Sequence, residues 1–280
     1  MTHIIEKTDL NKQVFRVVLD APLIARKASP GQFVIVRVDD AGERIPLTIS
    51  DYDREKGTIT LVVQVAGATT LQFSKLNAGD VLADVVGPLG KPTELNGIKR
   101  AAVIGGGVGC AIAYPVAREL SRMGAQVDGV IGFRNRELVI LENEFEEACA
   151  SLHLMTDDGS AGDKGLVTDA LKKLIESGVR YDRVFAIGPL VMMKFVSALT
   201  REYGIPTVVS MNPIMIDGTG MCGGCRLTVG GKMCFACIDG PDFDGHQVDF
   251  DEMIMRSKTY ADFEKHAYEE GCNLFAGRCE

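Results

Sequence analysis

Four of the eight cysteines of this chain lie close together, at Cys222, Cys225, Cys234 and Cys237, in a stretch that is also rich in glycine. The other cysteines are scattered along the sequence. Disulfide bonds are rare in reducing compartments, and thiols gathered this densely among glycines are typical of metal or cluster sites. The strongest constraint in the sequence is therefore an inorganic site near residue 225.

The spacing within this segment favours a [2Fe–2S] cluster. Plant-type clusters use Cys-x4-Cys-x2-Cys and a distant fourth cysteine. Asp217, Cys222 and Cys225 keep this spacing, with aspartate in place of the first thiolate, and Cys237 follows as the fourth ligand. The glycines between them let a short loop wrap around the sulfides and direct backbone N–H groups toward them.

Two other kinds of site match the same cysteines. Cys222-x2-Cys225 followed by Cys234-x2-Cys237 fits a four-thiolate zinc knuckle, although the gap between the pairs is shorter than in most zinc ribbons. A redox dithiol is a third interpretation, but it needs only one of the pairs. If the cluster interpretation is right, Cys234 is a spare thiol, and we expect it to be buried.

Charge and hydropathy exclude several functional classes. The net charge of -8 and the pI near 5.2 argue against a nucleic-acid partner, because phosphate binding needs a basic surface. No apolar run reaches the roughly 18–20 residues of a membrane span, and the start Met1-Thr2-His3 is unlike a signal peptide. We therefore expect a cytoplasmic protein with no membrane partner.

The first part of the chain predicts β structure. Short β-branched runs cover Val14–Asp20, Gly31–Val38 and Gly57–Val65, and turn signals separate them. Many short strands at this spacing indicate a small antiparallel barrel, interrupted by one short helix at about Thr70–Leu76.

From about Lys99 the pattern becomes one of strands alternating with helices, which indicates a doubly wound parallel sheet. The expected elements are a strand at Ala101–Ile104, a helix at Cys110–Met123, a strand at Val127–Gly132, a helix at Glu142–Ala150, a strand at Leu152–Met155, a helix at Leu166–Ser177, a strand at Arg183–Ile187 and a helix at Leu190–Tyr203. Regularity is lost at Met211, and Asp251–Gly271 is again helical in pattern. We predict three domains: a barrel at 1–98, an α/β domain at 99–210 and a cysteine-rich module at 211–280.

Two stretches of the barrel suit a flavin. Arg44–Ser50 and Val63–Thr70 offer a cation, hydroxyls, a glycine and a helix start for phosphate. Two ordinary strands with an exposed arginine would show the same polar and apolar alternation, so this pattern alone does not decide.

In the α/β domain, Gly105–Gly109 joins a strand to a helix, which is the context of a phosphate cradle. The strict G-x-G-x-x-G fingerprint is absent, and tight helix–strand packing explains the glycines equally well. The strand ends at Arg134, Asp157–Asp158 and Gly188–Met192 fall on the same edge, where ligands bind in such sheets.

The three segments, in this order, resemble the ferredoxin–NADP reductase superfamily over essentially the whole chain. Within it they are similar to the electron-transfer subunits of NAD-linked dihydroorotate dehydrogenases, because Cys237-Ile-Asp-Gly-Pro241 resembles the terminal Cys-x-Asp-Gly-Pro of that branch. Those subunits have cysteine at the position of Asp217. An aspartate there resembles the small subunit of the NADH-dependent reduced ferredoxin:NADP oxidoreductases, which are electron-bifurcating flavoproteins.

The resemblance implies an electron-transfer oxidoreductase subunit with three cofactors: FAD, a [2Fe–2S] cluster and NAD(H), with NADP(H) also open. It also implies a large partner subunit that carries a second flavin, [4Fe–4S] clusters and the sites for NADP(H) and ferredoxin. The alternatives are the electron-transfer subunit of a dihydroorotate dehydrogenase and, outside enzymes, a zinc-stabilised interaction module. Cofactors perform the chemistry in either enzyme, so no catalytic acid–base residue is expected.

By the same resemblance, Asp217, Cys222, Cys225 and Cys237 are the cluster ligands. Ile45 and Gln64 stand where arginines are common in the dihydroorotate branch, and Ile187 stands where many relatives have cysteine. The expected flavin and nucleotide contacts are Arg44, Pro46, Leu47, Thr48, Val63, Gln64, Val65, Gly67, Thr69, Thr70, Gly106, Gly107, Val108, Gly109, Arg134, Asp157, Asp158, Gly188, Pro189 and Met192.

Overall fold

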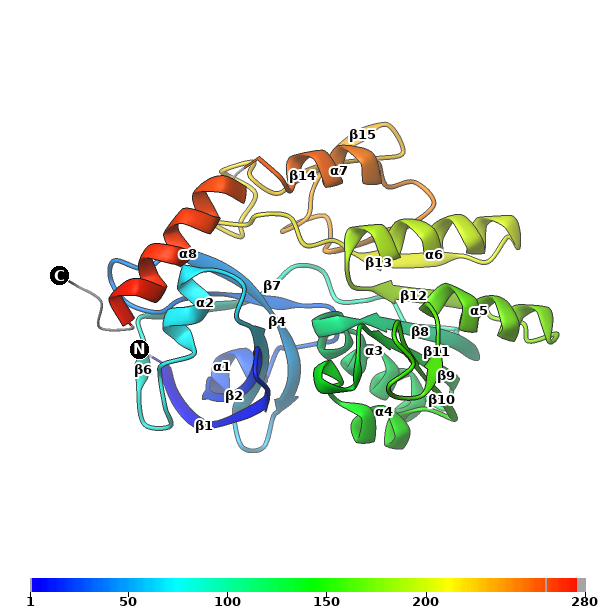
Figure 1. Ribbon diagram of the computed structural model, residues 1–280, viewed down its shortest axis with the longest axis horizontal. Helices are drawn as coiled ribbons and strands as arrows, with labels where there is room; N and C mark the ends of the chain where they lie inside the picture. The colour runs from blue at the N-terminus through cyan, green and yellow to red at the C-terminus, as the bar shows by residue number, and fades with distance from the viewer. Residues whose placement is uncertain (1, 260, 276–280) are drawn as a thin grey trace.

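The computed structural model describes residues 2–259 and 261–275, with only the backbone described over 271–275. Figure 1 shows three parts: a barrel at the left in blue and cyan, an α/β sheet at the right in green, and a yellow-to-orange segment that crosses above both. Cys279 lies outside the described residues, and nothing is described of the Cys272 side chain.

The N-terminal part is a nearly closed antiparallel sheet of seven described strands, in the order β6-β1-β2-β5-β4-β3-β7. Alternate residues face its interior: Ile59, Leu61 and Val63 of one strand are buried, whereas the residues between them are not. The elements are β1 (Thr2–Asn11), β2 (Val14–Asp20), α1 (Pro22–Ala25), β3 (Phe33–Arg37), β4 (Arg44–Asp53), β5 (Thr58–Gln64), α2 (Ala68–Phe73), β6 (Val81–Leu82) and β7 (Asp84–Leu89).

The second part is a sheet in the order β11-β10-β9-β8-β12-β13-β16, with helices on both faces (Figure 1). Its central strands are buried on both sides, as parallel strands between helices must be. The elements are β8 (Arg100–Gly106), η1 (Gly107–Gly109), α3 (Cys110–Arg122), β9 (Gln126–Phe133), η2 (Arg136–Leu138), α4 (Glu142–Ala148), β10 (Ser151–Thr156), β11 (Asp163–Lys164), α5 (Val167–Glu176), β12 (Arg183–Ile187), α6 (Leu190–Glu202) and β13 (Thr207–Ser210).

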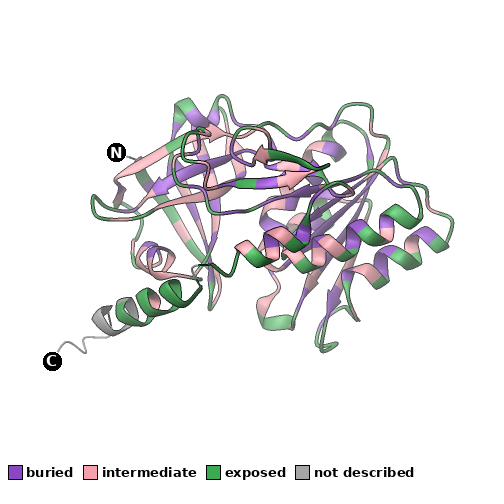
Figure 2. Cartoon of the chain, turned by 90° about the horizontal axis from the view of Figure 1, so that it is seen from above, coloured by how far each residue is buried: buried purple, intermediate pink, exposed green. Residues whose placement is uncertain are grey.

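The third part is attached to both of the others. Its strand β16 pairs antiparallel with β13 and so completes the edge of the parallel sheet. Its last helix, α8, lies along α2 of the barrel and is largely exposed (Figure 2). The elements are β14 (Arg226–Val229), β15 (Lys232–Phe235), β16 (Asp242–Asp244), α7 (Phe250–Arg256) and α8 (Ala261–Phe275).

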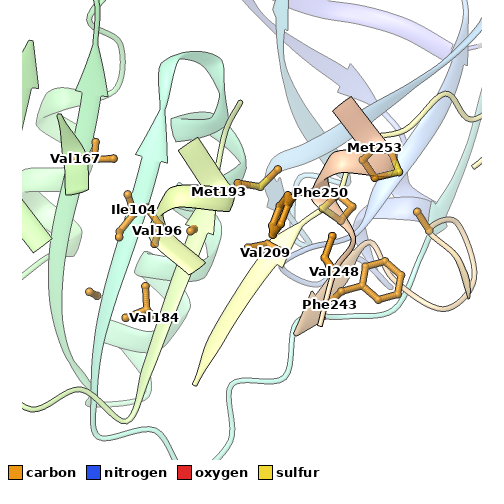
Figure 3. Packing of buried hydrophobic residues seen from close by; sticks show 14 of the residues in the cluster. Ile104, Val167, Val184, Met193, Val196, Val209, Phe243, Val248, Phe250 and Met253 are labelled. Atoms are coloured by element: carbon orange, nitrogen blue, oxygen red, sulfur yellow. The ribbon is translucent and has the colours of Figure 1, made fainter. Parts of the chain in front are cut away.

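One hydrophobic core is shared between the sheet and this third part. Figure 3 shows Val209 of β13 and Met193 of α6 packed near Phe250 and Met253 of α7, with Phe243 of β16 beside Val248. All of these side chains are buried. The cysteine-rich segment therefore does not stand on its own: its packing depends on the sheet.

The predicted fold class, an antiparallel barrel followed by a doubly wound sheet and a small C-terminal module, is confirmed. The strands predicted at Val14–Asp20 and Arg183–Ile187 have those bounds in the structure. Within the described residues, no helix has the length and apolar character needed to cross a bilayer.

The helical pattern expected over Asp251–Gly271 is confirmed for most of that range, which contains two helices, α7 and α8. The Asp249 carboxylate caps α7 by accepting from the Glu252 N–H at 2.9 Å. The Ser257 hydroxyl donates back to the Ile254 carbonyl where the helix ends, and α8 begins at Ala261.

Candidate functional site

A cleft of about 1180 Å³ lies between the barrel and the sheet. Its volume exceeds that of most small-molecule pockets, which fits an extended ligand such as a dinucleotide. The predicted residues that line it are Pro46, Leu47, Thr48 and Gln64 from the barrel and Gly106, Gly107, Val108, Gly109, Arg134, Asp157, Gly188, Pro189 and Met192 from the sheet. The two sets, far apart in sequence, thus meet across one cavity.

On the sheet side, the glycine loop after β8 packs directly against the end of β12. A Cβ on Gly109 would lie 2.5 Å from the Ile187 carbonyl oxygen, and one on Gly188 would lie 3.1 Å from the Gly106 Cα. A Cβ on Gly107, by contrast, would meet no atom within 4 Å. Tight packing thus explains Gly106, Gly109 and Gly188, while Gly107 faces open space at the start of the turn into α3.

On the barrel side, β3 and β4 form part of the cleft wall. Phe33 pairs with Thr48 in the register of these strands, and all three of Phe33, Pro46 and Thr48 line the cleft. In β5 the predicted Val63 is buried in the barrel core, and its neighbours Val62 and Gln64 reach the cleft instead. A two-residue side-chain period explains this, because a core position cannot also face a ligand.

Several other predicted contacts lie away from the cleft. The Thr70 hydroxyl accepts the Ala66 and Gly67 N–H groups at 2.9 and 3.0 Å and so caps α2. The Thr69 hydroxyl is buried and donates to Glu43 Oε2 at 3.2 Å. The cleft lining also excludes Val65, Gly67 and Arg44, the last of which donates from Nε to the Ile216 carbonyl at 2.8 Å.

The nucleotide-side rim carries charges of both signs. Exposed Arg134 and Asp157 follow β9 and β10 at the same edge, and Lys172 of α5 also lines the cleft. Asp158 points elsewhere: its carboxylate accepts from the Ser160 hydroxyl and N–H, which lowers its pKa. Arg134 and Asp157 are therefore the predicted rim residues that the structure keeps in reach of a ligand.

The cysteine-rich loop is held by the Asp217 carboxylate. Its Oδ1 accepts the Thr219 N–H at 2.9 Å and its Oδ2 accepts the Cys222 N–H at 2.8 Å. These backbone bonds, the Thr219 bond above all, lower the pKa of Asp217, so the group is an anion at neutral pH. A carboxylate has about four acceptor sites, so both oxygens can still bind a cation.

Two of the three proposed thiol ligands form a buried pair. The Cys225 and Cys237 sulfurs lie 3.3 Å apart, and burial raises the pKa of the Cys237 thiol. Cys222, by contrast, is exposed. Among the described residues, no three His, Cys, Asp or Glu side chains converge on one point where a single ion could sit.

This arrangement fits a two-iron cluster better than one zinc ion. A binuclear cluster divides its four ligands between two metals, whereas a structural zinc ion needs four ligands around one centre. Cys234, the fourth thiol of the zinc interpretation, pairs with Leu227 in the β14–β15 hairpin. The expectation that Cys234 is buried is wrong: it is half-buried, packed against the hydrophobic cluster that contains its strand partner Leu227.

Residues that fit a [2Fe–2S] cluster are thus present in the loop, and residues that fit a flavin are present in the cleft. Gly218, Gly220 and Gly223 adopt positive φ values of 75°, 84° and 67°, which lets the loop turn its N–H groups inward as a cluster cradle requires. The cleft combines open backbone at Gly107 with an apolar wall for a flavin ring.

Sequence reasoning missed part of the cleft lining. Phe33 looked like an ordinary strand residue, and Ser210 and Met211 lay at the predicted domain boundary. Leu166, Val191 and Phe195 are exposed apolar side chains on the same rim, and only their exposure marks them. The residues in question are Asn11, Gln13, Phe33, Val62, Leu166, Val191, Phe195, Ser210, Met211 and Asn212.

Comparison with known proteins agrees with this geometry. Residues 212–249 match the iron-sulfur cluster binding domain of dihydroorotate dehydrogenase B. The chain is 46% identical to a dihydroorotate dehydrogenase B (NAD(+)) electron transfer subunit homolog of Thermotoga maritima, covering 96% of this chain and 95% of that protein. It is 35% identical to the corresponding electron transfer subunit of Listeria innocua, covering 88% and 96%.

A solved structure is also similar over nearly the whole chain. A chain of the NADH-dependent reduced ferredoxin-NADP oxidoreductase, described in connection with flavin-based electron bifurcation, superposes with a TM-score of 0.92 at 44% identity, covering 96% of this chain and 97% of that one. More distant reductases, such as a cytochrome b5 reductase domain at 17% identity and a TM-score of 0.58, share the fold alone.

These relatives confirm the predicted class of oxidoreductase subunit and its cofactor set of FAD, a [2Fe–2S] cluster and a pyridine nucleotide. They also support the coarse expectation of a larger partner subunit. The chain therefore belongs to the family of dihydroorotate dehydrogenase B electron-transfer subunits.

Proposed function

We propose that the chain is the NAD(H)-linked small subunit of an electron-bifurcating oxidoreductase. In this proposal residues 1–98 hold FAD, residues 99–210 hold NAD(H) and residues 211–280 hold the cluster. The large partner carries a second flavin and [4Fe–4S] clusters and handles NADP(H) and ferredoxin. No nucleic acid or membrane takes part.

The single observation that carries the proposal is the cleft, in which one face of β3–β4 lies opposite the glycine loop and the Gly188–Met192 turn. Bound there, flavin and nicotinamide would exchange a hydride, which is chemistry that belongs to the cofactors. The residues of the chain orient the two rings and exclude water, with Pro46 and Thr48 on one wall and Gly107, Pro189 and Met192 on the other.

Asp217 supports the bifurcating enzyme over the dihydroorotate enzyme. It stands at a position where the dihydroorotate branch has a fourth cysteine, and its charge is already stabilised by two N–H groups. We expect Asp217→Cys to retain the cluster and lower its midpoint potential, because a thiolate donates more electron density than a carboxylate. Redox titration checks this, and an unchanged midpoint would argue against a ligand role.

The unpaired cysteines indicate a reducing compartment. Cys110, Cys149, Cys222, Cys225, Cys234 and Cys237 form no disulfide among the described residues. Disulfides are rare in the cytosol, so we propose a cytoplasmic location.

Anaerobic purification of the complex from its native host tests the function. We expect one FAD and two irons with acid-labile sulfide on this chain, and NADP⁺ reduction that requires NADH and reduced ferredoxin together. One zinc and no flavin would contradict the proposal.

The second candidate is the electron-transfer subunit of dihydroorotate dehydrogenase, which the names of the relatives favour. It predicts dihydroorotate-dependent NAD⁺ reduction by the same complex, with no need for ferredoxin. The two assays on one preparation separate the candidates.

A further inference from the structure

Arg44 connects the flavin side of the barrel to the cysteine-rich loop. It precedes Pro46 by two positions on β4, so the two side chains lie on the same face of the strand, about 7 Å apart along it. Pro46 lines the cleft, whereas the Arg44 Nε donates to the carbonyl of Ile216 at 2.8 Å. Ile216 immediately precedes Asp217 in the chain.

The turn that carries Asp217 also rests on the barrel. Gly218 is buried with φ of 75°, and a Cβ there would lie 2.6 Å from Leu89 Cδ1 and 3.1 Å from Ile35 Cγ1. Ile35 pairs with Pro46 across β3 and β4, which places it on the face that continues into the cleft. The start of the cysteine-rich loop and the barrel wall of the cleft are therefore parts of one surface.

Arg44 also brings a positive charge to the start of the cysteine-rich loop. Among the described residues, no carboxylate forms an ion pair with it, although its neighbour across the strands, Arg37, pairs with Asp84 at 2.7 Å. A guanidinium keeps its charge at any physiological pH. A cluster with one carboxylate and three thiolate ligands is anionic, and a nearby cation favours the reduced, more negative form.

We propose that Arg44 is a positioning residue that fixes the Asp217 turn to the flavin-binding face of β4 and, through its charge, raises the reduction potential of the cluster. This inference rests on the proposed function, since it needs a flavin in the cleft and a cluster in the loop. This role differs from the predicted flavin contact of Arg44, since Arg44 does not line the cleft and its Nε donates to the Ile216 carbonyl.

The test compares three variants of the purified complex. Arg44→Gln removes the charge and shortens the side chain, Arg44→Lys keeps the charge without the planar Nε donor, and Arg16→Gln is the matched control. Arg16 is on β2 of the same barrel, where it lies 3.6 Å from Glu6, so its replacement removes the same charge without touching the loop. For each variant we would measure FAD and iron content, the midpoint potential and the EPR spectrum of the reduced cluster.

We expect Arg44→Gln to retain FAD and to lower the midpoint potential of the cluster by about 59 mV. For a one-electron couple this is a tenfold change in the equilibrium constant for electron transfer to the cluster. Arg44→Lys should give a midpoint potential close to that of the wild type. Its EPR spectrum should be broader, because the Asp217 turn loses the hydrogen bond from the Arg44 Nε. Arg16→Gln should match the wild type in both.

Wild-type potential and spectrum in both Arg44 variants would overturn the inference, as would an equal shift in Arg16→Gln. If Arg44→Gln does not fold, Arg44→Lys decides by the EPR spectrum. Wild-type protein that lacks iron or flavin would instead refute the proposed function, so the two failures are distinguishable.

Discussion

The cleft and the cysteine-rich loop are built in opposite ways. The cleft gathers residues from β3, β4, β5, the glycine loop, β12, α5 and α6, and regular sheet packing shapes it. The loop takes its proposed ligands from one short stretch, 217–237, and positive-φ glycines and local hydrogen bonds shape it. A site made of contiguous residues can be recognised from spacing, whereas an assembled site depends on the whole fold.

The largest effect is expected from removing one proposed cluster ligand in the cysteine-rich loop. Cys222 is exposed, so Cys222→Ser should leave the core intact while removing the cluster and its visible absorbance, with FAD retained. Iron analysis and flavin fluorescence measure the two sites separately. Cys234→Ser is the control and should keep the cluster, and loss of metal in that variant would restore the zinc interpretation.

A smaller effect is expected from the glycines of the cleft. Gly109→Ala would place its Cβ 2.5 Å from the Ile187 carbonyl oxygen and 2.7 Å from the Gly188 Cα, and backbone atoms cannot move away cheaply. We expect the free energy of unfolding to fall by about 3 kcal/mol, and nucleotide affinity to fall with it. Urea denaturation and nucleotide titration measure these quantities.

Gly107→Ala is the matched comparison within the same loop. Its Cβ meets open space, so only the positive φ of 55° is strained, at about 1 kcal/mol. A larger loss of stability in Gly107→Ala than in Gly109→Ala would show that packing does not shape the loop.

Asp242 provides a further test, because it lies on β16, where the cysteine-rich segment joins the sheet. Burial raises the pKa of its carboxyl to about 6, against the hydrogen bonds from Thr93 and Ser210, and Oδ1 has no partner among the described residues. Because the folded pKa lies above the unfolded value of 3.8, the folded state binds the proton more tightly, and stability falls as pH rises from about 4 to about 6.

Asp242→Asn should therefore raise the free energy of unfolding at pH 8 by on the order of 2 kcal/mol and remove its decline between pH 4 and 6. Urea denaturation at several pH values measures this. Exposed Asp20→Asn is the control and should leave the decline unchanged. A variant that kept the wild-type decline would place the titrating group elsewhere.

The sequence was most informative where chemistry is local. The ligand spacing, the strand–glycine–helix turn at 105–110 and the alternation of strands and helices are all short-range patterns, and they predicted the fold class correctly. Contacts between residues far apart in the sequence leave no such pattern. Nothing in the residues of β16 indicates that it joins β13, and nothing near Arg44 indicates that its donor reaches Ile216 rather than a cofactor.

The sequence also did not predict which of two neighbouring strand residues faces the cleft. Val63 and Val62 are equivalent in type, and only the register of β5 decides which of them faces the core. A shift of one residue exchanges the two faces, and composition carries no information about it.

The antiparallel pairing of β16 with β13 has a mechanical consequence. It ties the far end of the cysteine-rich segment to the nucleotide sheet, while the near end, at residues 216–218, is seated on the barrel. A rotation of the sheet against the barrel would therefore stretch or relax the segment between these two anchors. It would also change the distance between a cluster held in the loop and a flavin held in the cleft.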